Sequence, residues 1–239
     1  MKTFSMTDKG MTREMNQDSV FTSEKPIGNL PNLFVVADGM GGHRAGDYAS
    51  KYAVEVLIRE IAGDEGTEPP AIMQRAIEAA NRELLSEAET DPRYHGMGTT
   101  VVLAVIEGST LWTANVGDSR LYLIDEQIQQ VTRDHSLVAE MVLKGELTNE
   151  EARVHRDRNI ITRAVGVVDH VQADIYEHKL QEGSRVLMCT DGLSNMLADD
   201  EILSIVKSQR DIVETVERLI QAANDNGGTD NITAIVIEP

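Results

Sequence analysis

The order of helix-like and strand-like segments is the feature that most restricts the fold of this 239-residue chain. Helical periodicities come in pairs, at residues 45–61 and 72–88 and again at residues 200–207 and 212–223, and runs of short strands separate the two pairs. Repeated strand–helix–strand units would instead place single helices between single strands. The pattern therefore predicts an α+β fold and argues against a parallel α/β sheet.

Ten segments have the composition and length of strands. Short turns between several of them, such as residues 107–109 and 125–126, predict antiparallel pairing. Ten strands are many for one open sheet, so we expect two mainly antiparallel sheets packed face to face and flanked by helices. The chain length suits one domain spanning residues 1–239. The predicted strands are residues 3–7, 18–22, 33–37, 99–106, 110–115, 120–124, 127–131, 173–180, 185–190 and 232–237.

A charged insertion, about Leu137 to Arg158, interrupts the strands. It begins with a short amphipathic segment, and Thr148-Asn149-Glu150-Glu151 matches a capping box, which predicts a second short helix. Such a segment is typical of a small flap. On these residues alone, a functional lid and a solvated surface excursion are equally good interpretations.

Charge and composition exclude several classes of partner. The net charge of −18 argues against binding to nucleic acid and to anionic membrane surfaces. The longest apolar run, residues 101–106, has the length of a strand, and the N-terminus has no apolar core of a signal peptide. The single cysteine, Cys189, excludes an internal disulfide and suits a reducing compartment. We therefore predict a cytoplasmic globular protein.

Three aspartates lie at or near the ends of apolar strands, beside glycine. Asp38 and Asp191 each follow such a strand, and Asp230 precedes the last one. Three carboxylates that converged in space would be costly to keep ionised without cations. Hard divalent ions take oxygen ligands from carboxylates, carbonyls and water, so the pattern predicts a divalent metal site.

Each of these pieces has a plainer interpretation when it is taken alone. The glycine-rich segment from Asp38 to His43 could be a hairpin or a loop that holds a nucleotide phosphate, although its spacing is not G-x-G-x-x-G. Asp118 lies in the turn between two predicted strands, and an aspartate at such a position most often only stabilises the turn. The decision between these interpretations depends on the whole set of motifs.

Eight short motifs, spread over residues 10–233, occur together in one order. With them the chain resembles the bacterial PPM, or PP2C-type, metal-dependent serine/threonine protein phosphatases. Each motif is weak alone, and the ordered set is specific. The motifs are Gly10-Met11-Thr12-Arg13-Glu14-Met15-Asn16-Gln17-Asp18, Asp38-Gly39-Met40-Gly41-Gly42-His43, Gly96-Met97-Gly98-Thr99-Thr100, Val116-Gly117-Asp118-Ser119-Arg120, Asp134-His135-Ser136, Ile161-Thr162-Arg163-Ala164-Val165-Gly166, Cys189-Thr190-Asp191-Gly192-Leu193 and Gly227-Gly228-Thr229-Asp230-Asn231-Ile232-Thr233.

The resemblance implies an α-β-β-α sandwich with two Mn²⁺ or Mg²⁺ ions in a channel between the sheets. Asp38 matches the bridging ligand, and the carbonyl of Gly39, Asp191 and Asp230 complete the set. Asp118, together with Asp191, matches a third and weaker ion site of bacterial members.

The resemblance also assigns the remaining site residues. Arg13 matches the arginine that binds the substrate phosphate, Asp18 an acid that contacts metal-bound water, and His43 the proposed general acid. The family's flap falls on the insertion at about residues 137–158. The implied reaction is hydrolysis of phosphoserine and phosphothreonine by direct attack of a metal-bridging hydroxide, without a phosphoenzyme.

The implied partners are phosphorylated proteins and a cognate serine/threonine kinase, and we expect a monomer. Two alternatives stay open: a catalytically inactive binding relative and a phosphomonoesterase of small molecules. A cysteine-dependent phosphatase is excluded, because Asn195 stands where the arginine six positions after Cys189 would be required. An Asp-x-Asp-x-Thr nucleophile motif is absent as well, and His135 is expected to be structural.

Overall fold

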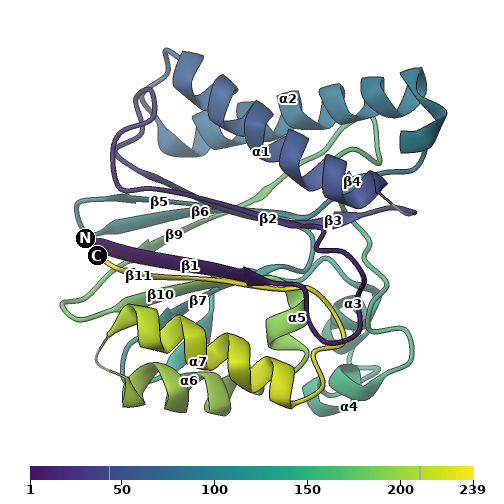
Figure 1. The fold of residues 1–239 in the computed structure, drawn as a ribbon. Helices are drawn as coiled ribbons and strands as arrows, with labels where there is room; N and C mark the ends of the chain where they lie inside the picture. Colours follow the sequence, from purple (N-terminus) through teal and green to yellow (C-terminus); the bar gives the residue numbers. More distant parts are fainter. Residues whose placement is uncertain (43, 210) are drawn as a thin grey trace.

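Two antiparallel sheets lie face to face in the centre of the molecule, with helices outside each of them (Figure 1). The computed structural model describes residues 1–42, 44–209 and 211–239. One sheet has the strand order β1-β11-β10-β7-β8, and the other has the order β2-β3-β5-β6-β9, with β4 paired to β3. The predicted fold class, an α-β-β-α sandwich, is confirmed.

The strands agree closely with the predicted segments. The main difference is at β3, which runs three residues further than predicted because it gains β4 as a partner. The strands are β1 Lys2–Asp8, β2 Asp18–Ser23, β3 Leu33–Met40, β4 Gly98–Thr99, β5 Val101–Glu107, β6 Thr110–Val116, β7 Arg120–Ile124, β8 Ile128–Gln130, β9 Asp174–Lys179, β10 Arg185–Cys189 and β11 Ile232–Glu238.

The helices form the outer layers and the flap. Pro69 opens α2 as predicted, and α5 was not predicted, because a four-residue helix carries too little periodicity to recognise. The helices are α1 Ala45–Gly63, α2 Pro69–Thr90, the 3₁₀ helix η1 Pro92–Tyr94, α3 Leu137–Leu143, α4 Asn149–Val154, α5 Asp191–Ser194, α6 Asp199–Ser208 and α7 Ile212–Asp225.

Alternate side chains of the central strands pack into different layers of the core. On β3, Leu33, Val35 and Ala37 pack under α1 and α2, whereas Phe34 and Val36 lie between the two sheets. On β11, Ile235 faces the other sheet in the same way. Because both faces of these strands are buried, their sequences are continuous apolar runs instead of alternating patterns. The space between the sheets is thus filled by apolar side chains over most of its length.

The flap projects from the end of the sandwich opposite the two chain termini, where α3 and α4 lie in Figure 1. The predicted capping box is present, since Thr148 and Glu151 bond each other's backbone N–H groups. The two ends of the segment meet at a bridge between Ser136 and Ile161, slightly beyond the predicted limit near residue 158.

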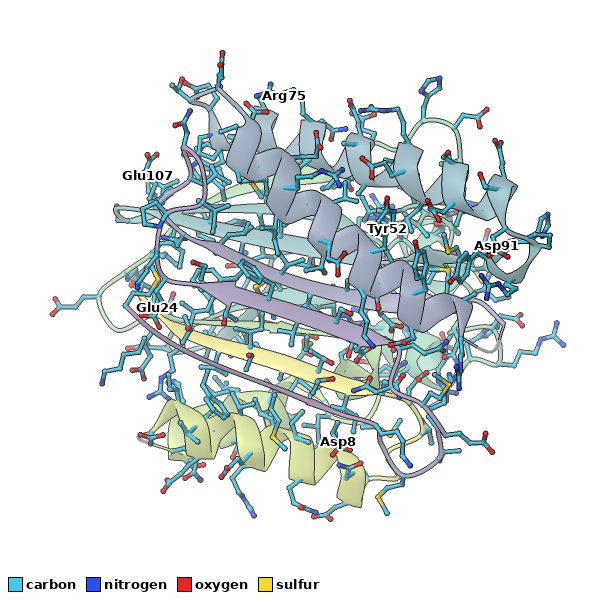
Figure 2. The ribbon with its side chains drawn as sticks, turned by 45° about the horizontal axis from the view of Figure 1, so that its top comes forward. Asp8, Glu24, Tyr52, Arg75, Asp91 and Glu107 are labelled. Atoms are coloured by element: carbon cyan, nitrogen blue, oxygen red, sulfur yellow. The ribbon has the colours of Figure 1, made fainter. Side chains whose placement is uncertain are left out.

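The two ends of the sandwich differ in what they carry. Glu24 and Glu107, just after β2 and at the end of β5, lie at one end, on the left of Figure 2. The predicted metal ligands lie at the other end, beside α5 and the flap. No helix in the described part of the chain is long and apolar enough to cross a membrane.

Candidate metal and phosphate site

Asp38 lies within β3, near the point where that strand meets β4. Its backbone N–H donates to the hydroxyl of Thr100 at 3.0 Å, and its carbonyl accepts from the N–H of Thr100 at 2.9 Å. The next residue must be glycine, because a Cβ on Gly39 would lie 2.0 Å from the carbonyl oxygen of Gly46. Strand pairing and this close approach to α1 therefore fix the backbone that carries the Asp38 carboxylate.

Asp18 sits opposite Asp38 on the neighbouring strand β2 and is buried. Its Oδ2 accepts hydrogen bonds from the hydroxyls of Thr190 at 2.9 Å and Thr233 at 2.6 Å. Both threonines belong to the other sheet's strands or their ends, so Asp18 joins the two sheets. Its Oδ1 is buried and has no hydrogen-bond partner among the described residues.

Asp191 begins α5, directly after the strand β10. Its Oδ2 accepts a hydrogen bond from Asn195 at 3.0 Å, and its Oδ1 is buried without a partner among the described residues. A Cβ on Gly192 would lie 1.9 Å from the carbonyl oxygen of Asn231, so only glycine lets α5 pack against the start of β11. This contact brings Asp191 and Asp230, separated by 39 residues in sequence, to one place.

Asp230 and Arg13 are held together at the edge of the site. The guanidinium of Arg13 donates to Oδ2 of Asp230 at 2.6 Å, and the N–H of Asn231 donates to Oδ1 at 2.8 Å. Asn231 also fixes the loop that carries Arg13, because its amide donates to the carbonyls of Lys9 and Met15. The predicted phosphate ligand thus lies beside a predicted metal ligand.

The electrostatics of the acids show that they form one cluster. Burial, together with the charges of Asp191 and Asp230, raises the pKa of Asp18 to about 7, although the two threonine hydrogen bonds act to lower it. Burial and the charge of Asp230 raise the pKa of Asp191 to about 6, and the neighbouring Asp38 and the positive charges of Arg120 and Arg13 act to lower it.

The other two acids belong to the same cluster. Burial raises the pKa of Asp38 well above its usual range, and so do the charges of Asp18, Asp191 and Asp118. Burial and the charge of Asp191 likewise raise the pKa of Asp118. Acids that disfavour one another's ionisation so strongly are suited to cations.

The cluster meets the chemical requirements of a divalent metal site. It offers only oxygen ligands, and two of its carboxylate oxygens are buried without a partner. Within residues 1–42, 44–209 and 211–239, no three acidic, histidine or cysteine side chains stand in the geometry of a complete single-ion site. Arg13 and Asn195 explain part of this, since they hold Asp230 and Asp191 as hydrogen-bond acceptors.

Asp118 occupies a turn that a histidine holds in place. Nδ1 of His135 accepts from the N–H of Gly117 at 3.0 Å, and the backbone N–H of His135 donates to the carbonyl of Gly117. Nε2 of His135 lies 3.1 Å from the carboxylate of Asp174, which also pairs with Arg163. Burial lowers the pKa of His135, so its ring is neutral near pH 7. The structural role expected for His135 is therefore specific: it positions the turn of Asp118.

Sequence reasoning assigned no role to several residues that support the site. Thr190 and Thr233 bind Asp18, Asn195 binds Asp191, and Asn231 fixes the Arg13 loop. The signal was present, because each lies in or beside a motif that was recognised for its acid. His43, the predicted general acid, lies outside the described residues. Burial raises the pKa of Cys189 to about 12, which opposes any role as a nucleophile.

Residues 11–236 match the family described as Protein phosphatase 2C. The chain belongs to this family. It is 40% identical over 244 residues to the serine/threonine phosphatase stp of Listeria monocytogenes serotype 4b (strain F2365), a match that covers 97% of this chain and 93% of that protein.

Solved structures agree with this membership. The serine/threonine phosphatase of S. agalactiae is similar with a TM-score of 0.91 and 37% identity, covering 100% of this chain and 99% of the other. The catalytic domain of the phosphatase PstP, in complex with 2 manganese ions, is similar with a TM-score of 0.86 and 33% identity, covering 98% of this chain and 96% of the other. The likeness thus includes a structure of this fold that holds manganese.

Proposed function

We propose that this chain is a metal-dependent protein phosphatase that removes phosphate from phosphoserine and phosphothreonine in proteins. The observation that carries the proposal is the cluster of buried acids, contributed by both sheets, whose ionisation is disfavoured without cations. Membership of the protein phosphatase 2C family supports the reaction class. The proposal covers residues 1–239 as one catalytic domain with a flap.

Asp38, the carbonyl of Gly39, Asp191 and Asp230 would hold two Mn²⁺ or Mg²⁺ ions, and Asp118 with Asp191 would hold a third ion weakly. When bound, the ions would supply Lewis acidity toward water and toward the phosphoryl oxygens, and would neutralise the acids. The buried, unpartnered Oδ1 of Asp191 supports this assignment. A third site with few protein ligands would depend on water and bind weakly.

The chain's own residues bind and orient the substrate. Arg13, whose side chain is 48% exposed, can leave Asp230 for the phosphoryl oxygens and hold them through two parallel N–H groups. The Oδ1 of Asp18 would accept a hydrogen bond from water at the metal site, because both threonine hydroxyls bind the opposite oxygen. His43 would donate a proton to the departing alkoxide, a role that suits the imidazole group of histidine.

Two alternatives make different predictions. An inactive binding relative would bind a phosphorylated protein without releasing phosphate, and the presence of all the predicted acids argues against it. A phosphomonoesterase of small molecules would act on phosphopeptides no better than on aryl phosphates. A cognate serine/threonine kinase, the monomeric state and a cytoplasmic location stay predictions.

The direct experiment is phosphate release from a phosphothreonine peptide by chelated protein, with and without added Mn²⁺. The proposal expects turnover only with the metal. Equal turnover after chelation would overturn the metal dependence. No release with Mn²⁺ or Mg²⁺, together with retained binding of the peptide, would favour the inactive relative.

A further inference from the structure

A series of hydrogen bonds connects the surface loop that carries Arg13 to the buried carboxylate of Asp18. The side-chain amide of Asn16 donates to the hydroxyl of Thr7 at 2.8 Å. The hydroxyl of Thr7 lies 2.7 Å from that of Thr233, which in turn lies 2.6 Å from Oδ2 of Asp18. The backbone N–H of Asp18 donates back to the amide oxygen of Asn16 at 3.1 Å. We call these residues, Asn16, Thr7, Thr233 and Asp18, the Asp18 ring.

The members of the Asp18 ring come from separate parts of the fold. Thr7 is exposed and lies near the end of β1, the outer strand of its sheet. Thr233 stands opposite it on β11 and is fully buried. Asp18 begins β2, which belongs to the other sheet. An exposed hydroxyl on one sheet is therefore only two hydrogen bonds away from a buried carboxylate on the other.

The direction of each hydrogen bond follows from the number of protons available. A hydroxyl has one proton to donate, and an ionised carboxylate has none. When Asp18 is ionised, Thr233 must donate to it, and Thr7 must therefore donate to Thr233. The oxygen of Thr7 accepts the N–H of Asn16. All the donors thus point toward Asp18, and successive hydrogen bonds in such a series polarise and strengthen one another.

The hydrogen bonds also fix how the carboxylate of Asp18 is turned. Thr190 donates to the same Oδ2 at 2.9 Å, and its oxygen accepts the N–H of Thr233 at 3.0 Å. Turning Oδ2 away would leave two fully buried hydroxyls without an acceptor, which is costly. Oδ1 is therefore the oxygen of Asp18 that stays free for a further hydrogen bond.

We propose that Thr7 and Asn16 are positioning residues for the reaction. Through Thr233 they hold the carboxylate of Asp18 so that its Oδ1 accepts a hydrogen bond from water at the metal site. This inference rests on the proposed phosphatase function and adds two residues to it, one of them on the outer strand of a sheet. If Thr7 only tied β1 to β11, its hydroxyl would contribute to stability alone.

Thr7→Val removes the hydroxyl and keeps the β-branched shape of the side chain. We expect kcat for a phosphothreonine peptide to fall roughly threefold to tenfold, the value of one hydrogen bond, with KM nearly unchanged. In calorimetric titrations of the chelated protein, Mn²⁺ should bind about threefold or more weakly, because Asp18 orients metal-bound water. Thr7→Ser keeps a hydroxyl and should restore both quantities. A lower melting temperature of Thr7→Val with unchanged kcat and Mn²⁺ affinity would overturn the proposal.

Thr3→Val is the matched control. Thr3 lies on β1 like Thr7 and, four residues away on a strand, shares its face. Its hydroxyl donates to Glu24 at 2.8 Å, at the end of the sandwich away from the metal site. The variant therefore loses one hydroxyl and one hydrogen bond as Thr7→Val does, and it should keep the wild-type kcat and Mn²⁺ affinity. Equal losses in the two variants would show an effect of β1 as a whole and would contradict the role of the ring.

A double-mutant cycle tests whether Thr7 acts through Asp18. In the Asp18→Ala background there is no carboxylate to position, so Thr7→Val should lower the Mn²⁺ affinity no further. The Thr233→Val background gives a second cycle with the carboxylate in place, and there too Thr7→Val should have no added effect on kcat or Mn²⁺ affinity. Additive effects in either background would mean that Thr7 acts by another route, and the proposal would be wrong.

The wild type separates failure of this inference from failure of the proposed function. If the wild type binds Mn²⁺ and releases phosphate from the peptide, and Thr7→Val does both equally well, the positioning role alone is overturned. If the wild type neither binds Mn²⁺ nor releases phosphate, the proposed function is overturned, and the positioning role with it.

Discussion

The same strand faces line the middle and one end of the space between the sheets. They carry apolar side chains in the middle and acidic or polar side chains at that end. On β3, Phe34 and Val36 fill the middle, and Asp38, the next residue on that face, is an acid. On β11, Ile235 faces the middle and Thr233 binds Asp18. The two-residue period of a strand thus carries polar groups into the same buried layer that the apolar groups fill.

This difference teaches how the fold can hold a charged site rigidly. The apolar middle stabilises the sandwich by burial, and it brings strand ends from both sheets together at one place. There the acids are buried by the same packing, at the cost of raised pKa values. The buried acids destabilise the folded protein when no cation is bound, and in the proposed function they hold the metal ions.

Among substitutions in these two regions, we expect the largest effect at Asp38. Asp38→Asn keeps the size of the side chain and removes the charge that would bridge the metals. Loss of several kcal/mol of transition-state stabilisation corresponds to a fall in kcat of roughly a thousandfold or more. Steady-state kinetics with a phosphothreonine peptide and saturating Mn²⁺ measure it. A loss below tenfold would remove Asp38 from the metal site.

Arg13→Ala should have the next largest effect. A charged hydrogen bond to phosphate contributes about 1.5–3 kcal/mol, so KM should rise roughly tenfold to a hundredfold for peptide and aryl phosphate alike. Arg93→Ala, at an exposed arginine on η1 that pairs with Asp91, is the matched control. An unchanged KM would mean that Arg13 serves only to pair with Asp230.

The raised pKa values predict how the stability of chelated protein depends on pH. A carboxyl group whose pKa is higher in the folded state binds protons more tightly there. Its protonation therefore stabilises the folded protein fully below the unfolded-state pKa near 3.8, and this stabilisation is lost as the pH rises through the folded-state pKa. Between about pH 4 and pH 8 the melting temperature should fall by about 5 °C or more. This pH range includes the folded-state pKa values of about 6 for Asp191 and about 7 for Asp18.

Two comparisons sharpen this prediction. Asp18→Asn should flatten the pH dependence, because its amide does not ionise. Saturating Mn²⁺ should raise the melting temperature most at high pH, since the ion binds only the folded state and competes with protons. A melting temperature of the chelated protein that rises from pH 5 to pH 8 would contradict the cluster of disfavoured acids.

Asp118→Asn tests the third ion with a smaller expected effect. If Asp118 is a ligand, the variant should keep its fold and its affinity for two ions, and lose most of its turnover of protein substrates at every Mn²⁺ concentration. If it serves only the turn that His135 holds, asparagine should replace it with little loss. Superimposable curves of activity against Mn²⁺ for wild type and variant would exclude the ligand role.

The smallest effect is expected in the apolar middle. Ile235→Val should lower the free energy of unfolding by about 0.5–1.5 kcal/mol and leave kcat unchanged. Ile235 is fully buried between the sheets, two residues from Thr233 on the same strand face. Denaturant unfolding and peptide kinetics on the same preparation measure both quantities. A large fall in kcat would mean that the middle and the end of the sandwich are not separable.

The fold could be predicted to a large extent from periodicity. Apolar runs and paired helical stripes gave the two sheets and their helical layers, and the capping box at Thr148 located α4. The short elements escaped prediction, because β4 and α5 have two and four residues and depend on tertiary contacts. The extension of β3 to Met40 has the same cause, since β4 is its partner there.

The site could be predicted only in part. The acids were recognised because carboxylates beside glycine at strand ends are unusual, and the ordered motifs gave their proposed roles. The supporting residues lie in or beside these recognised motifs, but their hydrogen bonds to the acids could not be predicted from the sequence. Thr190 and Thr233 are ordinary strand residues until the sheets face each other, and the bond from His135 to Gly117 joins residues that are 18 positions apart.

Calorimetric titration of Mn²⁺ into the chelated protein tests the central claim most directly, because it reports binding without requiring turnover. The account predicts two saturable equivalents in the wild type, with any third much weaker, and loss of this binding in Asp38→Asn, while Ile235→Val binds as the wild type does. Absence of saturable binding in the wild type, or identical isotherms for the wild type and Asp38→Asn, would contradict the assignment of the acid cluster as the metal site.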